Sequence, residues 1–473
     1  MNKKSRMYDP SFFRVCYIAV LFFTNLTFIQ IPAYLALVFM FFWGVRLAIY
    51  KIRVQHCLKR LRFSIWLIAF MAANVVAMLI FFTWGIIYSI IMLLHMSICF
   101  FIFYGIHTEE GLNPKAELYK VCRFIIYATS IAGIIGFILM MCHVKFELNW
   151  DNIFIIKFII FENRFTGIYM NPNMLGFVSV VSIVCCHIIS KHDFLAQAKK
   201  PRISRIVLAV CLCVNLFSLL LCDSNASFVL LICYVIFTIV FYFFSNPARL
   251  TLKQILTKSL ALLLACVYIV GAAFLTRMVC QKTFSTLLTT TKLSDEAIES
   301  KEEITFEHEN KNADSGRLKL IKESVGLFKI SPVFGIGNGN IILFSQQNLS
   351  GTLAFNYHNH DLHNGYLTIL VSSGVLGFCL FAVFGFRFTK HTVSNLFKRQ
   401  KADSQDILPC LFAFCCGYLI YSLFEKALLF DISFMVMWFW YMIGMTGVYL
   451  NKYEPMETGY YNFKKHRIPK HMI

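Results

Sequence analysis

Runs of apolar residues recur from one end of the chain to the other, separated by short polar segments. Each run is long enough to cross the hydrocarbon core of a bilayer as an α-helix, which needs about 20 residues. The runs lie at 12–29, 31–50, 64–83, 84–106, 124–142, 174–190, 206–222, 226–244, 259–276, 364–386, 407–424 and 431–450. The pattern therefore predicts an all-α integral membrane protein with about twelve transmembrane helices, in one polytopic domain over residues 1–473.

The composition agrees with this class. Hydrophobic residues make up 58% of the chain and charged residues 15%, whereas soluble domains carry about 25% charged residues. Alternating segments of about ten residues, typical of a membrane β-barrel, do not occur in the sequence. Most of the 17 cysteines fall inside the apolar runs, where a free thiol packs as a small hydrophobic group. No cleavage site follows the first run, so we expect an uncleaved first span.

The net charge of +19 suggests nucleic-acid binding until the charges are placed along the chain. Most of the 44 Lys and Arg residues lie in alternate connecting segments, while the acidic residues gather in the others. Because cytoplasmic loops retain positive charge, this asymmetry predicts that both termini are cytoplasmic and that the chain binds no nucleic acid. Arg14 and Arg46, near the cytoplasmic span ends, are expected to extend to the membrane interface.

Two segments on the predicted outer side are too long to be turns, namely 143–173 and a large extracytoplasmic loop at 276–362. The first part of the large loop is polar and acidic. After Asp314, apolar residues recur with helical spacing, from Leu318 to Phe328, and Ser331 and Pro332 end the pattern. This part of the loop is predicted to be a short amphipathic helix on the outer membrane surface.

Arginine is scarce on the predicted outer side, where only Arg164, Arg277 and Arg317 occur. Arg277 stands at the end of the ninth run and is interpreted as an interfacial anchor. Arg164 and Arg317 remain as candidates to bind phosphate, because a guanidinium presents a planar fork of donors that matches phosphate oxygens. The alternative is a surface arginine paired with a neighbouring carboxylate, Glu162 or Glu323.

Three histidines, His358, His360 and His363, stand where the large loop meets the tenth run. Their HxHxxH spacing permits a zinc site, but no further set of ligands follows, so we predict none. His363 is either a general base at the outer surface or an interfacial cap of the helix that it precedes. Glu425, beyond the eleventh run, either pairs with Lys426 or contacts an acceptor.

A glycine-rich segment, residues 335–340 (Gly-Ile-Gly-Asn-Gly-Asn), resembles a nucleotide-binding loop at first sight. It follows a proline in an outer loop instead of a β-strand, and its glycine spacing does not match the dinucleotide motif. We interpret this segment as a connector rich in turns.

Together these residues make residues 160–450 resemble the O-antigen ligase and polysaccharide polymerase family. Four stretches carry the resemblance: Arg-Phe-Thr-Gly at 164–167 with Asn-Pro-Asn at 171–173; Gly-Arg at 316–317 with Ser-Pro-Val-Phe-Gly-Ile-Gly at 331–337; His-Asn-Gly-Tyr-Leu at 363–367 with Gly-Val-Leu-Gly at 374–377; and Phe-Glu at 424–425. Many members also have an arginine at the outer start of the eighth span. Residues 223–227 (Asp-Ser-Asn-Ala-Ser) lack it here, with Asn225 in that stretch.

The resemblance implies a GT-C-like, metal-independent glycosyltransferase without cofactors in the bacterial cytoplasmic membrane. Such enzymes transfer a glycan from undecaprenyl diphosphate to a sugar hydroxyl on the extracytoplasmic side, and inversion at the anomeric carbon is expected by analogy.

Carried over residue by residue, the resemblance makes Arg164 and Arg317 the binding groups for the donor's diphosphate. His363 would be the catalytic residue. The side chains that would contact the acceptor or support the site are His360, Asn364, Tyr366 and Glu425.

The motifs serve a polymerase, an O-antigen-type ligase and a glycan-to-protein transferase alike. We favour a polymerase, because nothing in the chain indicates the lipid A core acceptor that a ligase requires. A transporter such as a lipid-linked oligosaccharide flippase is the alternative from another class. It would concentrate ionisable residues near the membrane midplane, whereas here they gather at the outer edge.

Overall fold

A computed structural model provides the fold and describes these residues: 6–82, 85–142, 147–150, 154–157, 159–161, 164–192, 203–243, 252–291, 317–348, 362–397 and 407–451. The longer helices are α1 (Pro10–Phe23), α2 (Gln30–Arg53), α4 (Ser64–Ile80), α5 (Ile86–Ser97), α6 (Pro114–Met141), α7 (Pro172–His192), α8 (Arg205–Leu221), α9 (Asn225–Phe243), α10 (Leu252–Thr291), α14 (Gly365–Phe397), α15 (Leu408–Tyr421) and α16 (Phe434–Asn451). Shorter elements are α3 (Cys57–Arg60), α11 (Arg317–Phe328), α12 (Ile341–Asn348), a π-helical segment (Ile98–Phe103) and the 3-10 turns Arg6–Tyr8, Thr27–Ile29, Tyr104–Thr108 and Asn338–Asn340.

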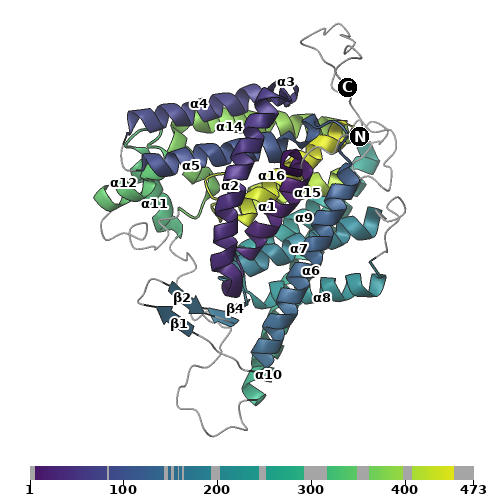
Figure 1. Ribbon diagram of the computed structural model, residues 1–473. Helices are drawn as coiled ribbons and strands as arrows, with labels where there is room; N and C mark the ends of the chain where they lie inside the picture. The colour runs from purple at the N-terminus through teal and green to yellow at the C-terminus, as the bar shows by residue number, and fades with distance from the viewer. Residues whose placement is uncertain are drawn as a thin grey trace.

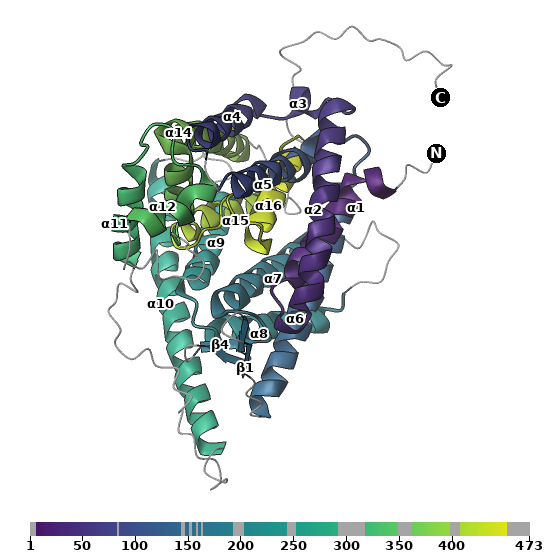
Figure 2. The same cartoon turned by 60° about the vertical axis from the view of Figure 1, so that its left-hand side comes forward.

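The helices form one bundle in which segments distant in sequence lie against one another (Figures 1 and 2). Within the described residues, 7 helices are long and apolar enough to cross a membrane, and the shorter apolar helices are α1, α4, α8, α15 and α16. Each predicted run overlaps one of these helices. The helical membrane class is therefore confirmed, while the number of about twelve spans stays a prediction.

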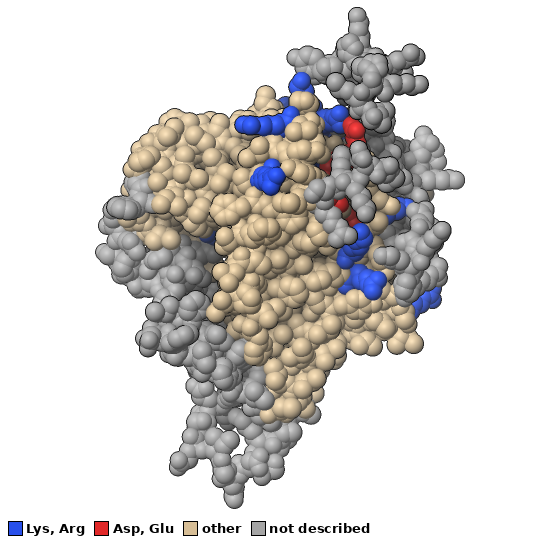
Figure 3. Space-filling model, in the orientation of Figure 1, with Lys and Arg blue, Asp and Glu red and all other residues tan. Residues whose placement is uncertain are grey.

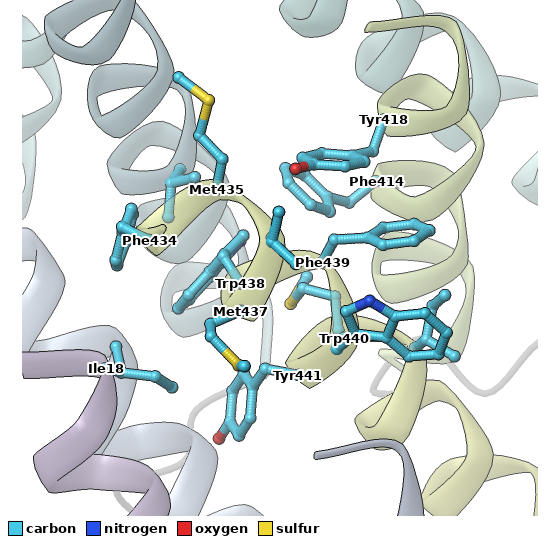
Figure 4. Packing of buried hydrophobic residues seen from close by; sticks show 14 of the residues in the cluster. Ile18, Phe414, Tyr418, Phe434, Met435, Met437, Trp438, Phe439, Trp440 and Tyr441 are labelled. Atoms are coloured by element: carbon cyan, nitrogen blue, oxygen red, sulfur yellow. The ribbon is translucent and has the colours of Figure 1, made fainter. Parts of the chain in front are cut away.

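Aromatic residues of α16 pack in the buried core against residues of α15 and α1 (Figure 4). Phe439 stacks on Tyr418 of α15 with ring centroids 4.5 Å apart, a favourable offset geometry. Two core side chains donate hydrogen bonds to the turn between α15 and α16. The Tyr418 hydroxyl donates to the Ala427 carbonyl, and the Trp440 indole N–H donates to the Leu428 carbonyl. The core therefore fixes the turn that carries Glu425.

A break in α14 joins the glycine-rich connector, residues 335–340, to the bundle. Gly374 has φ +65°, and a Cβ there would lie 2.2 Å from the Val333 carbonyl oxygen. The amides of Ile336 and Gly337 donate to the carbonyls of Val371 and Ser372 across this break. Segment 335–340, predicted as a connector, therefore donates hydrogen bonds to backbone carbonyls at the break in α14. Buried backbone groups of a membrane protein need such partners.

Two short hairpins add β-structure to a fold that was predicted from helices alone. β1 (Glu147–Trp150) pairs with β2 (Phe154–Lys157), and β3 (Ile159–Phe161) pairs with β4 (Arg164–Gly167), both antiparallel. The outer segment 153–161 consists of Ile and Phe with one Lys, a composition that favours strands. α10 also extends beyond the predicted ninth run, to Thr291.

Charged residues are unevenly spread over the surface. On the face in Figure 3, the described Lys and Arg side chains gather over the upper and right-hand parts, while the lower part, where α6 ends, shows none. Which end faces the cytoplasm stays a prediction.

Arg14 does not extend to the interface as predicted, because it is fully buried between two carboxylates. Its guanidinium binds Glu117 through Nε and Nη2, at 2.8 and 2.7 Å, and its Nη1 lies 2.6 Å from Glu109. Lys51, also buried, lies 2.6 Å from the same Glu109 oxygen. These ion pairs compensate the Arg14 and Lys51 charges for the water that they lose on burial.

This network predicts a loss of stability in acid. Burial raises the pKa of the Glu109 carboxyl, but the adjacent Arg14 and Lys51 charges outweigh burial and hold that pKa below its usual value of 4.5. A carboxyl whose pKa is lower in the folded state stabilises the fold above its unfolded pKa, and that stability is lost as the pH falls through the folded pKa. We expect Glu109→Gln to cost about 3 kcal/mol at pH 7 and to flatten the melting temperature profile below pH 4.5. Thermal unfolding in detergent from neutral to acidic pH measures both effects; an unchanged profile would contradict this interpretation.

Candidate functional site

Arg164 begins β4 and is held by its neighbours beside the start of α7 and the end of α8. Phe165 is buried and stacks on Phe137 of α6, with ring centroids 5.3 Å apart. The Met170 amide donates to the Asn25 carbonyl at 3.1 Å, which attaches this segment to the turn between α1 and α2. The Arg164 guanidinium then reaches the turn between α8 and α9, where its Nε donates to the Cys222 carbonyl at 3.1 Å.

Asn173, in the first turn of α7, connects Arg164 to the other side of the site. Its Oδ1 accepts from Arg164 Nη2 at 2.9 Å and from the Ser224 hydroxyl at 3.2 Å. Its Nδ2 donates to Glu425 Oε1 at 3.0 Å. A glycine one turn later, Gly176, lets α7 approach α9 closely, because a Cβ there would lie 2.8 Å from the Ser227 hydroxyl oxygen.

His363 lies on the far side of Glu425. Its Nδ1 is 3.8 Å from Glu425 Oε2, and the two side chains are 28% and 11% exposed. The backbone of His363 is left-handed, with φ +44°, which directs the chain into the start of α14. The structure thus brings Arg164, Glu425 and His363 into one series of polar contacts, with Asn173 in the middle. We call this series the Arg–Asn–Glu–His relay.

Asn364 and Tyr366 hold the start of α14 in place. The Asn364 Oδ1 accepts from the amides of Tyr366 and Leu367, at 2.9 and 3.0 Å, as an N-cap does. Its Nδ2 donates to the Leu423 carbonyl at 2.9 Å, and the Tyr366 hydroxyl donates to the Leu419 carbonyl at 2.8 Å. Both side chains, predicted to contact the acceptor or support the site, fasten α14 to the end of α15 and so position His363.

The remaining predicted residues are only partly placed. Arg317 begins α11, the predicted amphipathic helix, which packs against α14; its side chain lies outside the described residues. In α11, Leu320 and Leu327 face the protein, while Ile321 and Val325 are exposed, as suits a helix at a membrane surface. His358 and His360 lie outside the described residues.

Arg277 belongs to this site, although the sequence suggested only an interfacial anchor. It comes from α10, pairs with the Asp223 carboxylate and donates from Nη1 to Asn225 Oδ1 at 2.7 Å. Asp223 and Asn225 flank Ser224, which binds Asn173. Opposite charges directly after two apolar runs, 206–222 and 259–276, were the available signal for this pair.

The arrangement suits a negatively charged ligand. Three long helices, α7, α9 and α14, begin beside the relay, and a helix N-terminus carries a partial positive charge. The guanidinium of Arg164 adds a full charge and a planar set of donors. Within the described parts of the chain, no three His, Cys, Asp or Glu side chains form a group that could bind a metal ion. Anion binding beside a His–Glu pair is therefore the chemistry that these residues offer.

Comparison with known proteins agrees with the resemblance seen in the sequence. Residues 206–382 match a family model described as O-antigen ligase. The match includes Asn225, Arg277, Arg317 and His363, while Arg164 and Glu425 lie outside it. No curated protein matches the chain.

Proposed function

Since residues 206–382 match a family model described as O-antigen ligase, we propose that the chain is a membrane glycosyltransferase. It transfers or polymerises oligosaccharide units from undecaprenyl diphosphate onto an acceptor sugar hydroxyl, on the outer face of the bacterial cytoplasmic membrane. The observation that carries the proposal is the Arg–Asn–Glu–His relay, in which a guanidinium and an imidazole are connected through Asn173 and Glu425.

Arg164 binds the donor's diphosphate in this proposal. Its guanidinium stabilises the negative charge that grows on the diphosphate as the bond to the sugar breaks. Arg317, at the start of α11, supplies a second cation from the large outer loop. The lipid chain stays in the bilayer, and so the diphosphate is delivered at the membrane surface.

His363 takes the proton from the acceptor hydroxyl. As the acceptor oxygen forms a bond to the anomeric carbon, the bond from that carbon to the phosphate oxygen breaks, and its electron pair leaves with undecaprenyl diphosphate. The Glu425 carboxylate faces Nδ1 at 3.8 Å and stabilises the imidazolium that forms, leaving Nε2 to accept the proton.

A polymerase and a ligase would share this chemistry and differ in the acceptor. We favour a polymerase, whose acceptor is a second lipid-linked glycan of the same kind. Purified protein given a single lipid-linked oligosaccharide tests this choice. A polymerase produces chains of two or more repeats from that substrate alone, whereas a ligase leaves it unchanged until a different acceptor is added.

We expect transfer to continue unchanged in EDTA, because guanidinium groups supply the positive charge that a metal ion would otherwise provide. The measurement is the initial rate of product formation by purified protein before and after chelation and dialysis. A rate that falls with EDTA and returns with Zn²⁺ would contradict this expectation and favour a metal site that includes the HxHxxH histidines.

A further inference from the structure

The outer half of α10 is fastened to the bundle by a charged side chain. α10 contacts the rest of the protein through α8 and α9, and none of its most apolar window is buried. Figure 2 shows α10 along one side of the molecule, extending beyond the neighbouring helices. Among the side chains of α10 that the structure describes, Arg277 alone is buried. Burying an arginine in a membrane protein costs free energy, and a charged residue in such a place usually has a function.

Two guanidinium groups meet at residues 222–225, the turn between α8 and α9. Arg164 binds this turn at the Cys222 carbonyl, and Arg277 binds it at Asp223 and Asn225. Two positive charges brought to one turn repel each other. Asp223 offsets part of this repulsion, and its backbone is left-handed, with φ +50°. The Asp223 carboxylate therefore occupies one side of a turn that a second guanidinium, Arg164, binds at the neighbouring residue, Cys222.

We propose that Arg277 is an additional guanidinium of the donor site and that Asp223 occupies it until a lipid diphosphate arrives. This inference rests on the proposed function. A diphosphate has two linked phosphate groups, so one phosphate binds Arg164 while the other displaces the Asp223 carboxylate from Arg277. The exchange favours the diphosphate because it carries more negative charge than one carboxylate and contacts both guanidinium groups. A lipid monophosphate has a single phosphate group and less negative charge, so we expect it to gain little from the second arginine.

The ion pair has to open for this exchange. The Arg277 and Asp223 side chains are 10% and 7% exposed, so either Asp223 rotates away or the outer end of α10 shifts. Little protein opposes the shift, because the apolar surface of α10 is not covered by the bundle. Phe228, whose ring centroid lies 5.3 Å from the Arg277 guanidinium carbon, supports the guanidinium from one side.

The experiment measures binding of undecaprenyl diphosphate and undecaprenyl monophosphate to the full-length protein in nanodiscs. Asp223→Asn keeps the size of the side chain and tolerates the left-handed backbone. We expect this variant to bind the diphosphate about tenfold more tightly, because the competing carboxylate is gone, and Arg277→Gln to bind it about tenfold more weakly. Binding of the monophosphate should change little in either variant. Arg60→Gln, at an exposed ion pair with Glu110, is the matched control.

If Arg277 only anchors α10, both variants weaken diphosphate binding or change neither lipid, and the inference is wrong. Because the Asp223→Asn prediction is a gain of affinity, misfolding cannot imitate it. Failure of the unmodified protein to bind the diphosphate would overturn the proposed function together with this inference. Normal binding combined with a weaker Asp223→Asn variant would overturn the inference alone.

Discussion

Replacing His363 with asparagine is expected to lower the rate of glycan transfer at least about 100-fold, the usual contribution of a general base. Asparagine is the informative substitution, because His363 has a left-handed backbone that asparagine adopts more readily than alanine. The variant therefore keeps the turn into α14 and loses only the imidazole. The measurement is the initial rate of transfer from a lipid-linked oligosaccharide by purified protein, together with its thermal unfolding temperature.

His56 provides a matched control for this variant. It precedes α3, has φ +49° and is exposed. Figure 1 shows α3 at the top of the molecule and β4, which Arg164 begins, in its lower part. His56→Asn should transfer glycan at the normal rate. Normal activity in His363→Asn would remove the catalytic role of His363. A loss of activity accompanied by a large fall in melting temperature would assign His363 to stability instead.

Replacing Arg164 with glutamine is expected to lower kcat/KM for the lipid-linked donor by about 10²–10³-fold, the effect of losing a group that stabilises charge in a transition state. The substitution also removes the donor to Asn173 Oδ1, so the Arg–Asn–Glu–His relay loses its first member. Because both residues then act on one reaction step, adding His363→Asn should reduce the rate much less than the product of the two separate effects. Steady-state kinetics of the two single variants and the double variant measure this non-additivity.

Arg60→Gln again serves as the control, since its ion pair with Glu110 is exposed. Surface pairs of that kind contribute about 0–1 kcal/mol to stability, so this variant should behave as the unmodified protein does. If the effects of Arg164→Gln and His363→Asn multiply fully, the two residues act independently and the relay does not operate as a unit.

The sequence predicted the helices well, because a span needs a long apolar run and such runs can be read locally. It also selected His363, Arg164 and Glu425 as candidates, since ionisable residues are rare in this chain and stand out at the outer ends of the runs. The hairpins in 143–173 were missed, although the Ile and Phe composition of 153–161 was a usable signal.

The partners of these residues could not be predicted, because they come from distant parts of the chain. Asn173 and Glu425 are 252 positions apart, and Arg14 and Glu117 are 103 positions apart. Arg277 illustrates the same limit. As a residue at a span end it resembles an ordinary interfacial anchor, and only the packing of α10 beside the α8–α9 turn pairs it with Asp223. The Asn-Pro-Asn motif was recognised, but nothing local indicated that Asn173 connects a guanidinium to a carboxylate.

The most direct measurement is mass spectrometry of the lipids and glycans after purified protein in liposomes has received an undecaprenyl diphosphate-linked oligosaccharide and an acceptor glycan. The proposed enzyme releases one free undecaprenyl diphosphate for each new glycosidic bond, and the His363→Asn variant releases almost none. Intact donor that crosses the bilayer, with no new bond and no free undecaprenyl diphosphate, would contradict the account and identify a transporter.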